Sequence, residues 1–590
     1  ELKAQKKFAR FALASGLTAT MAFSNVAAPT VMAFADTESA VTFADADYAK
    51  STTYKGIQIF KAIVASTGEG TTVSNIEWAS DAAKEAVVAA IKAKDTSFAG
   101  DHAQDAADWL NANAGVDGTD SKVASDNVLS LIAANLEGKP GWETTTAGNP
   151  SLSNLEAGYW LFLTATAGKP DGKSTDAFTS PVYAVIDGVN PTTITPKKGV
   201  PTVEKKVLDD ADAVAPDIKG SDRWKDVADS QIGQEVNYRL TGTIASNYAT
   251  FSTYAYKFTD VLSDGLDYVN GSVEVYAVNG GTYSLVDANK YDVAWDAKTL
   301  TVEFKVDDVK RGLKDVDGVT ADTQIVVFYK AKLNGSAVIG NATAGNKGGN
   351  PNTVKLEYSN NPYAAGTGET IEDTVADFAF KLNLNKVDQG TEKGLPRAVF
   401  TIQSHDANTD GYYVASKTDT TEGVVEGQLV KVNDANNLPD YVKFTSGDDG
   451  KISVSGLDAG SYKVTEVQTP DNTKYTKANP FTFTIAPTYD ETTMKVTDLT
   501  AAVSESDKGR SDIAFGTLDG TAGDHKLTGV EGSGTNAATG EVTINVGNAK
   551  SVGLPVTGLD GVTLTWIAGG VVLVIGVARI IRRRRSESEE

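Results

Sequence analysis

The stretch FAFKLNLNKVD, residues 378–388, alternates apolar and polar side chains with a period of two. Successive side chains of a β-strand point to opposite sides, so this period predicts a strand with one buried face. The apolar row contains Phe378, Phe380, Leu382 and Leu384, and it ends on Lys386. The pattern therefore predicts a strand that carries a lysine into the core of a β domain.

Two later stretches also place polar groups near buried faces. In SYKVTEVQTP, Tyr462, Val464 and Glu466 share one face, so a carboxylic acid points inwards as well. The stretch VTINVGNAK contributes two amides, Asn545 and Asn548. We expect one lysine, one acid and one asparagine to meet in a single core.

The preceding region also contains a lysine, an acid and an asparagine on predicted strands, within different local sequences. In PTVEKKV, Lys205 lies in one row with Val203 and Val207. The aromatic row of YAYKFTDVL ends on Asp260, and the row of NTVKLEY begins with Asn352. The same set of lysine, acid and amide thus occurs in two successive regions.

Burial of a lysine, an acid and an asparagine together would make the lysine reactive towards the asparagine. It lowers the pKa of a lysine and raises the pKa of a carboxylic acid, by up to ~3–5 units, so the amine loses its charge and the acid keeps a proton. A neutral amine is a nucleophile, and it can attack an asparagine carbonyl that the acid polarises, with loss of ammonia. The product is a Lys–Asn isopeptide bond. The alternative is that the lysines snorkel and the acids form ordinary ion pairs, and periodicity alone leaves both interpretations open.

Composition narrows the class of protein. A chain of 590 residues is too long for one core and predicts three or four domains. The net charge of −23 argues against nucleic acid and anionic membranes as partners. There is no cysteine, so internal cross-links would take the place of disulfides. The three histidines lack metal-ligand spacing, and no phosphate-binding loop occurs, so we predict neither a metal site nor another cofactor.

The strand and helix patterns divide the chain into three β regions. Residues 36–196 mix strands such as YKGIQIFKAIVAS and GYWLFLTA with helical patterns such as SDAAKEAVVAAIKAK. Residues 197–374 and 375–553 consist of alternating strands separated by Gly, Asn and Asp turns. The predicted fold is mainly β, with tandem immunoglobulin-like sandwiches and helices inserted in the first one.

Both ends of the chain carry targeting patterns. Residues 559–578 form an apolar run of membrane length, and the arginines of residues 579–590 would hold the following tail in the cytoplasm. At the other end, lysines precede an apolar stretch and the small residues of VMAFA, which predicts a signal peptide cut between Ala35 and Asp36. A retained amphipathic helix is the alternative for residues 1–35.

Directly before the apolar run lies LPVTG, residues 554–558. This motif, the apolar run and the arginines together resemble the LPxTG sorting signal of Gram-positive surface proteins. The resemblance implies that a sortase recognises Leu554 and Pro555, cuts between Thr557 and Gly558, and couples Thr557 to an amine. An unprocessed single-span membrane protein is the alternative.

The domains resemble those of sortase-assembled major (backbone) pilins over nearly the whole mature chain. FTDVLSDGLDY and NTVKLEYSNNP look like the middle domain of such pilins, and NKVD, YKVTEVQTP and VGNAK look like a Cna B-type domain. YKVTEVQTPDNTKY is similar to the E-box of the family, with valine and glutamine where threonine and alanine are common. The resemblance implies two isopeptide bonds, each with a helper acid: Lys205 to Asn352 with Asp260, and Lys386 to Asn548 with Glu466. Asn548 is preferred because the family spells this position Asn-x-Lys, and Asn545 stays open.

Backbone pilins also need an acceptor lysine, which the family places in a Tyr-Pro-Lys context before the middle domain. Here TTITPKKGV has Lys197 after Pro196, with Thr195 in place of the tyrosine. Its amine would attack the sortase acyl-enzyme formed on Thr557 of another subunit. Lys198 remains an alternative acceptor.

The first domain has no comparable set. LEAGYWLFLTA looks like an E-box strand without its glutamate, and Lys55 and Lys61 have no evident asparagine partner. We therefore expect no isopeptide bond there, which would make this domain the mechanically softer part.

The function that these features predict is structural. The chain would be the backbone subunit of an extracellular, covalently polymerised pilus on a Gram-positive cell wall, and its partners would be a sortase, identical subunits, accessory pilins and peptidoglycan. It would not be an enzyme apart from forming its own cross-links. The alternative is a monomeric wall-anchored adhesin that binds a host surface ligand such as collagen. A surface hydrolase is disfavoured, because no solvent-exposed catalytic triad or metal constellation is evident.

Overall fold

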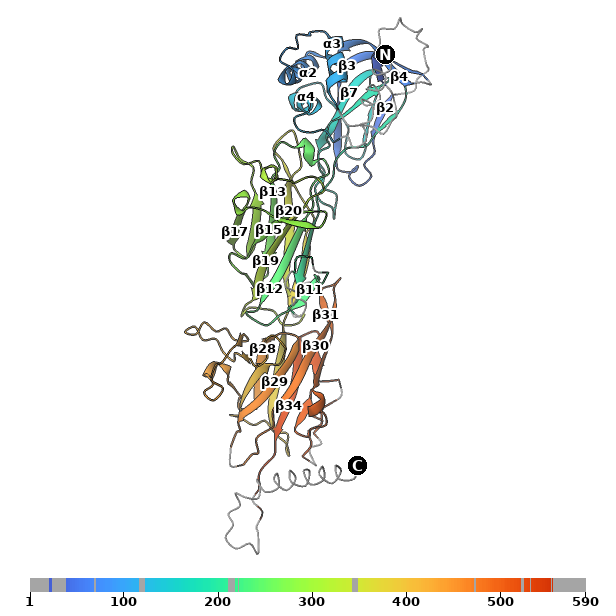
Figure 1. The fold of residues 1–590 in the computed structure, drawn as a ribbon. Helices are drawn as coiled ribbons and strands as arrows, with labels where there is room; N and C mark the ends of the chain where they lie inside the picture. Colours follow the sequence, from blue (N-terminus) through green and yellow to red (C-terminus); the bar gives the residue numbers. More distant parts are fainter. Residues whose placement is uncertain are drawn as a thin grey trace, which may run out of the picture.

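The computed structural model describes strand β1 (Met21–Phe23) and residues 39–67, 70–115, 122–210, 218–220, 222–341, 348–471, 474–520, 525–530, 532–552 and 554. They form three β domains that follow one another along an elongated molecule (Figure 1). The predicted mainly-β fold with tandem sandwiches is confirmed. In the described part of the chain no helix combines the length and apolarity needed to cross a membrane. The predicted signal-peptide cleavage point, the span at residues 559–578 and the basic tail lie outside the described residues.

The N-terminal domain places helices on one face of a sheet and a second sheet on the other. Its larger sheet has the order β1-β4-β3-β7-β8, with β5 beside β3, and its smaller sheet has the order β6-β2-β9. The strands are β2 (Ala40–Phe43), β3 (Thr53–Thr67), β4 (Gly70–Trp78), β5 (Glu143–Thr144), β6 (Ser151–Ser153), β7 (Gly158–Thr166), β8 (Val182–Ile186) and β9 (Thr192–Ile194).

The helices of this domain confirm the predicted insertion. They are α2 (Asp81–Lys94), α3 (Ala103–Asn113) and α4 (Val128–Leu136). Ser80 starts α2 because its hydroxyl accepts a hydrogen bond from the Ala83 amide at 3.1 Å. Alanine and leucine side chains of the helices pack on inward residues of β3 and β7, such as Ile59 and Leu161. The opposite face of β7 packs through Phe162 against the smaller sheet.

The middle domain is a sandwich of two sheets. One has the order β10-β12-β19-β15-β16, with β14 beside β19, and the other has the order β11-β22-β20-β13-β18-β17, with β21 beside β20. Between them lies an aromatic core that contains eight fully buried rings: Tyr238, Phe251, Tyr254, Tyr256, Phe258, Phe304, Tyr329 and Tyr358. The strands are β10 (Val203–Leu208), β11 (Val227–Asp229), β12 (Glu235–Gly242), β13 (Tyr256–Leu262), β14 (Leu266–Tyr268), β15 (Glu274–Asn279), β16 (Thr282–Leu285), β17 (Asp292–Asp296), β18 (Thr299–Phe304), β19 (Gln324–Leu333), β20 (Asn350–Ser359), β21 (Thr367–Glu369) and β22 (Asp373–Phe378).

The C-terminal domain is a second sandwich, with sheet orders β28-β23-β34-β32 and β26-β25-β24-β29-β30-β31. Its first strand, β23, lies parallel to its last strand, β34, so the two ends of the domain are neighbours. The strands are β23 (Phe380–Asp388), β24 (Val399–Ser404), β25 (Tyr413–Val414), β26 (Leu429–Val430), β27 (Phe444–Thr445), β28 (Lys451–Leu457), β29 (Gly460–Gln468), β30 (Phe481–Asp490), β31 (Lys495–Val503), β32 (Ile513–Phe515), β33 (Thr535–Asn536) and β34 (Glu541–Asn548). The predicted single strand is two strands, because β22 ends at Phe378 in the middle sheet and β23 starts at Phe380, but the Phe378 ring still packs in the same core as Phe380, Leu382 and Leu384.

A buried glutamine ties the middle domain to the C-terminal domain. Gln231 lies just after β11, and its Oε1 accepts hydrogen bonds from the Asp458 amide at 3.1 Å and the Tyr462 hydroxyl at 2.9 Å. Its Nε2 donates to the carbonyl oxygen of Gly427. Three residues of the C-terminal domain, in the loop at Gly427 and around the β28–β29 connection, are thus fixed to one side chain, which orients the two domains relative to each other.

Replacing Gln231→Ala should loosen this junction. The change leaves the buried Asp458 amide and the Gly427 carbonyl without these partners, at a cost of about 2–4 kcal/mol. We expect the thermal midpoint of residues 36–553 to fall by roughly 4–12 °C in calorimetry. The exposed Gln324→Ala on β19 serves as control and should change little. Equal midpoints for both variants would contradict this account of the junction.

Candidate functional site

The middle domain brings Lys205 and Asp260 together in its core. Lys205 comes from β10 in one sheet and Asp260 from β13 in the other, and both side chains are fully buried. The Nζ of Lys205 lies 2.7 Å from Oδ1 and 2.6 Å from Oδ2 of Asp260. Alternation along the strands explains the placement, because Val207 and Phe258 point into the same core.

The third predicted residue, Asn352, reaches this pair through a tyrosine that the sequence analysis missed. The hydroxyl of Tyr329 on β19 donates to Asp260 Oδ2 at 2.6 Å, and it accepts from Lys205 Nζ at 2.9 Å and from Asn352 Nδ2 at 2.6 Å. The Oδ1 of Asn352 is buried and has no hydrogen-bond partner in the described structure. Tyr329 belongs to the inward-facing apolar row of QIVVFYKAKL. Its hydroxyl, a polar group in that row, is the sequence feature that could have indicated a place in the site.

Burial shifts the charges of this site in the predicted direction. Desolvation lowers the pKa of Lys205 to about 8, although Asp260 partly opposes the change. Desolvation also raises the pKa of Asp260 above its ordinary value, against the effect of Lys205. The rings of Tyr238 and Tyr329 lie 5.3 and 5.2 Å from the amine and exclude water from it. Burial therefore favours the uncharged forms of both the amine and the acid, neither of which has exposed surface.

The C-terminal domain assembles the same residue types with a glutamate. Lys386 on β23 and Glu466 on β29 are fully buried, with Nζ 3.7 Å from Oε1. The other carboxylate oxygen of Glu466 accepts from Asn548 Nδ2 at 2.8 Å and from the Ala478 amide at 2.7 Å. Desolvation lowers the pKa of Lys386 to about 8. Here the acid contacts the asparagine directly.

The register of β34 separates the two candidate asparagines. Asn548 has the same parity as Val546, which pairs with Lys386, so it lies on the same face of the sheet as the lysine. Asn545 lies on the opposite face, where its Oδ1 accepts from Asn385 at 3.0 Å and its Nδ2 donates to the Ala514 carbonyl at 3.1 Å. Only Asn548 contacts the acid.

The two candidate acceptor lysines have opposite environments. The side chain of Lys198 is 8% exposed, and its Nζ forms ion pairs with Asp45, at 2.6 Å, and with Asp176. The backbone of Lys197 is fixed by hydrogen bonds to Thr179 Oγ1 at 2.7 Å and from the Ser180 amide at 2.8 Å. The side chain of Lys197 is partly exposed, and its amine has no ion pair within the described ranges.

The lysines of the N-terminal domain that sequence analysis considered form ion pairs. Lys55 Nζ lies 2.7 Å from Glu137 Oε1 and 4.5 Å from the ring centre of Trp142. Lys61 is half exposed and lies 3.2 Å from Glu156. In the described part of this domain, neither amine has an asparagine side chain as partner.

The chain leaves the C-terminal domain shortly before the predicted sorting motif. The Ser551 amide donates to the Lys474 carbonyl at 2.8 Å, and Lys550 Nζ lies 3.2 Å from Asp388. Leu554, three residues beyond Ser551, is 74% exposed. Pro555, Thr557 and Gly558 lie outside the described residues. The domain therefore holds the backbone as far as Ser551, three residues before LPVTG begins.

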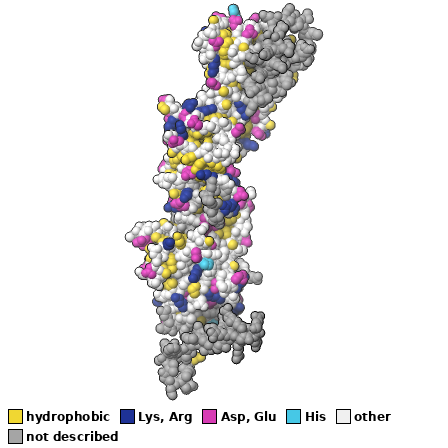
Figure 2. Space-filling view, in the orientation of Figure 1, with side chains coloured by type: hydrophobic (Ala, Val, Ile, Leu, Met, Phe, Trp, Pro, Cys, Tyr) yellow, Lys and Arg dark blue, Asp and Glu magenta, His cyan; other side chains and the backbone are white. Residues whose placement is uncertain are grey.

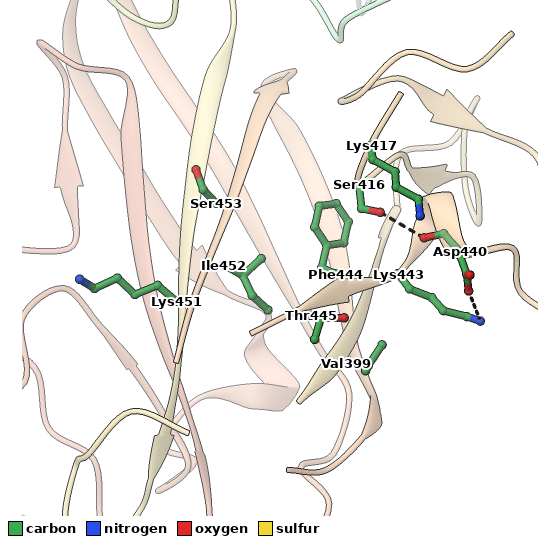
Figure 3. Close-up of a pocket in the computed structure, with 10 residues that line it drawn as sticks. All are labelled: Val399, Ser416, Lys417, Asp440, Lys443, Phe444, Thr445, Lys451, Ile452 and Ser453. Carbon is green, nitrogen blue, oxygen red and sulfur yellow. Dashed lines mark hydrogen bonds and ion pairs between the residues drawn. The ribbon is translucent and has the colours of Figure 1, made fainter. Parts of the chain in front are cut away.

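Charged side chains of both signs are mixed on the described surface. Figure 2 shows lysine, arginine, aspartate and glutamate side chains interspersed on the visible face. A hollow of about 640 Å³ on the C-terminal domain is lined by both charges, and within it Lys443 pairs with Asp440 at 3.0 Å (Figure 3). Such exposed pairs are solvated and contribute little, so this hollow lacks the burial of the two interior sites.

Comparisons with known proteins agree with this architecture. Residues 232–362 match the family model of the Gram-positive pilin backbone subunit 2, Cna-B-like domain, and residues 380–500 match the model of a prealbumin-like fold domain. No curated protein matches the sequence.

Several solved pilins are similar in structure at low identity. The T6 backbone pilin of serotype M6 Streptococcus pyogenes is 15% identical, with 87% of this chain and 98% of that chain covered and a TM-score of 0.47. The major pilin SpaD of Corynebacterium diphtheriae is 16% identical, with 87% and 98% covered and a TM-score of 0.41. The group B streptococcus pilus 2b backbone protein is 20% identical, with 55% and 95% covered and a TM-score of 0.36. Two segments of the chain, which together cover less than half of it, therefore resemble a domain of Gram-positive pilin backbone subunits and a prealbumin-like fold domain.

Proposed function

We propose that this protein is the backbone subunit of a covalent pilus in which a sortase joins Thr557 of one subunit to Lys197 of the next. Two intramolecular isopeptide bonds, Lys205 to Asn352 and Lys386 to Asn548, stabilise each subunit. The observation that carries the proposal is the convergence of a buried lysine, an acid and an asparagine in two successive domains, with each lysine pKa lowered to about 8.

The cross-linking reaction in the C-terminal domain needs only the groups in its core. The neutral amine of Lys386 attacks the side-chain carbonyl carbon of Asn548, which forms a C–N bond. Glu466 lies beside both partners, so it can take a proton from the attacking nitrogen and give one to the departing nitrogen. The carbon–nitrogen bond of the asparagine amide breaks, and ammonia leaves. No cofactor or outside reagent is consumed.

The positions of the proposed bonds suit a load-bearing subunit. In the C-terminal domain the bond would join β23 and β34, the first and last strands, which lie side by side and parallel. In the middle domain it would join β10 to β20 in the opposite sheet. Each bond closes a loop over most of its domain and thus restricts the unfolded chain, as a disulfide does in other secreted proteins.

The environment of the two acceptor candidates favours Lys197. Transfer requires an amine that enters the sortase site and attacks its acyl-enzyme. Lys198 would first have to break two ion pairs, with Asp45 and Asp176, in a nearly buried position. Lys197 lies on a fixed backbone with its amine available. The finished pilus would lie outside the cell and would include accessory pilins. Its base would be attached to wall peptidoglycan.

Intact mass should reveal both isopeptide bonds. The purified chain should be lighter than its sequence by two ammonia molecules, and Lys386→Ala should reduce the deficit to one. The C-terminal domain of this variant should also melt at a lower temperature and lose resistance to trypsin. A wild-type mass equal to the sequence would mean that the lysines are only ion-paired.

The rate of cross-linking in the middle domain should have a bell-shaped dependence on pH. The reactive pair, a neutral Lys205 and a protonated Asp260, holds one shared proton, as does the resting ion pair. Above a pH of about 8, the pKa of Lys205, that proton is lost and the acid cannot act. At low pH a second proton arrives and the amine stays charged. Chain refolded from an unfolded, unlinked state and followed by ammonia release should show this profile, whereas a rate that keeps rising above the lysine pKa would exclude an acidic role of Asp260.

Polymerisation should require Lys197 and tolerate the loss of the Lys198 amine. Arginine keeps the positive charge of lysine but is not an acceptor for the sortase acyl-enzyme. We expect Lys197→Arg to abolish the high-molecular-weight ladder that wild-type wall extracts give on immunoblots after boiling in detergent. Lys198→Arg is the matched control and should keep the ladder.

The same blot separates the pilus from the alternative of a monomeric, wall-anchored adhesin that binds a host surface ligand. A single monomer-sized band for the wild type, unchanged in Lys197→Arg, would favour the adhesin. Loss of the ladder only in Lys198→Arg would reverse the assignment of the acceptor.

A further inference from the structure

The two interior sites differ in the reach of their acids. In the C-terminal domain Glu466 contacts the asparagine nitrogen directly, with 2.8 Å between Oε2 and Asn548 Nδ2. In the middle domain Asp260 is one methylene shorter, and its oxygens bond to Lys205 and Tyr329 rather than to the asparagine. An acid that must serve both nitrogens therefore lacks direct access to one of them.

The hydroxyl of Tyr329 occupies this gap. It is 2.6 Å from Asp260 Oδ2 and 2.6 Å from Asn352 Nδ2, the nitrogen that would leave, and 2.9 Å from the attacking nitrogen of Lys205. One oxygen atom thus touches the acid, the nucleophile and the leaving group. No other hydroxyl among the described residues is hydrogen-bonded to Asn352 Nδ2.

We propose that Tyr329 is a catalytic residue of the cross-linking reaction in the middle domain and relays a proton between Asp260 and the departing nitrogen of Asn352. The inference rests on the proposed isopeptide bond between Lys205 and Asn352. It makes the aspartate and the tyrosine together the equivalent of the single glutamate in the next domain.

The protons of the reaction balance with this relay. The amine of Lys205, with two hydrogens, attacks the side-chain carbonyl carbon of Asn352, and the new C–N bond forms. Tyr329 gives its hydroxyl proton to the amide nitrogen and takes the proton of Asp260, while the carbon–nitrogen bond breaks and ammonia leaves. The attacking nitrogen then passes one hydrogen to the Asp260 carboxylate. The product amide keeps one hydrogen, and the acid and the hydroxyl return to their starting states.

The surroundings hold the hydroxyl in place for this step. The ring of Tyr329 is 1% exposed and stacks on Tyr238 at 5.3 Å with an interplanar angle of 13°. Burial and the nearby Asp260 raise the pKa of Tyr329 well above its ordinary value, so it remains a hydroxyl and carries a proton to give. Because the partners are fixed at hydrogen-bond distance, little reorganisation is needed for the relay.

The decisive variant is Tyr329→Phe, which removes the hydroxyl and keeps the ring. The full chain would be refolded from an unfolded, unlinked state. Formation of the Lys205–Asn352 isopeptide bond would be followed by mass spectrometry of the cross-linked peptide. The bond should form roughly 100-fold more slowly than in the wild type, the usual effect of losing a positioned proton donor. The Lys386–Asn548 bond of the same molecules should form at the wild-type rate, which controls for the quality of refolding.

Tyr238→Phe is the matched control. Tyr238 is equally buried beside Lys205 and stacks on Tyr329, but its hydroxyl has no hydrogen-bond partner in the described structure. Its removal should leave the rate unchanged. Equal rates for Tyr329→Phe and the wild type would overturn the relay, and so would an equal slowing by both tyrosine variants.

Restoring the reach of the acid gives a second, independent test. The double variant Asp260→Glu, Tyr329→Phe removes the hydroxyl and supplies a glutamate, the acid that the C-terminal domain uses. It should recover at least a tenth of the wild-type rate, whereas the recovery would be absent if Tyr329 had only a structural role. Absence of the middle-domain bond in the wild type would instead refute the proposed cross-link itself, so the two failures are distinguishable.

Discussion

A fully buried lysine amine beside a carboxylic acid is the interaction around which the cores of the middle and C-terminal domains are arranged. Removing two charges from water costs several kcal/mol per ion, which their attraction repays only in part. Lys205 and Asp260 have no exposed surface, and the tyrosine rings around them leave no room for solvent. On the proposed chemistry this costly pair is a precursor, because the amide that replaces it is neutral. The aromatic core of the middle domain is then the means by which the chain lowers the pKa of its nucleophile.

The two domains reach this state by different geometries. In the middle domain the amine and its aspartate come from facing sheets, so a bond to Asn352 on β20 would connect the two layers of the sandwich. In the C-terminal domain Lys386 and Asn548 lie on adjacent strands of one sheet, and only Glu466 comes from the other. The acid must reach the asparagine nitrogen in both domains. Asp260 would do so through the Tyr329 hydroxyl, whereas the longer Glu466 does so directly.

Much of this arrangement follows from a period of two. Alternation alone placed Lys205, Asp260, Lys386 and Glu466 on buried faces, and the structure has all four in the core. Alternation could not rank Asn548 against Asn545, because that ranking depends on which residue of β34 pairs with β23. Tyr329 was missed because a tyrosine in an apolar row resembles the other core aromatics until its partners are known. The acids that pair with Lys198 lie 22 and 153 residues away in the sequence, so no local pattern could predict the pairing.

If Lys197 is the acceptor, as proposed, its position would account for the lack of a lysine–acid–asparagine set among the described residues of the N-terminal domain. On the proposed linkage, tension enters a subunit at Lys197 and leaves it at Thr557. The path between these points runs through the middle and C-terminal domains, which hold the two buried sets, and Gln231 fastens one to the other. The N-terminal domain precedes Lys197 and lies outside the path. On this proposal the N-terminal domain would carry no load, so partly exposed ion pairs such as Lys55 with Glu137 would suffice there.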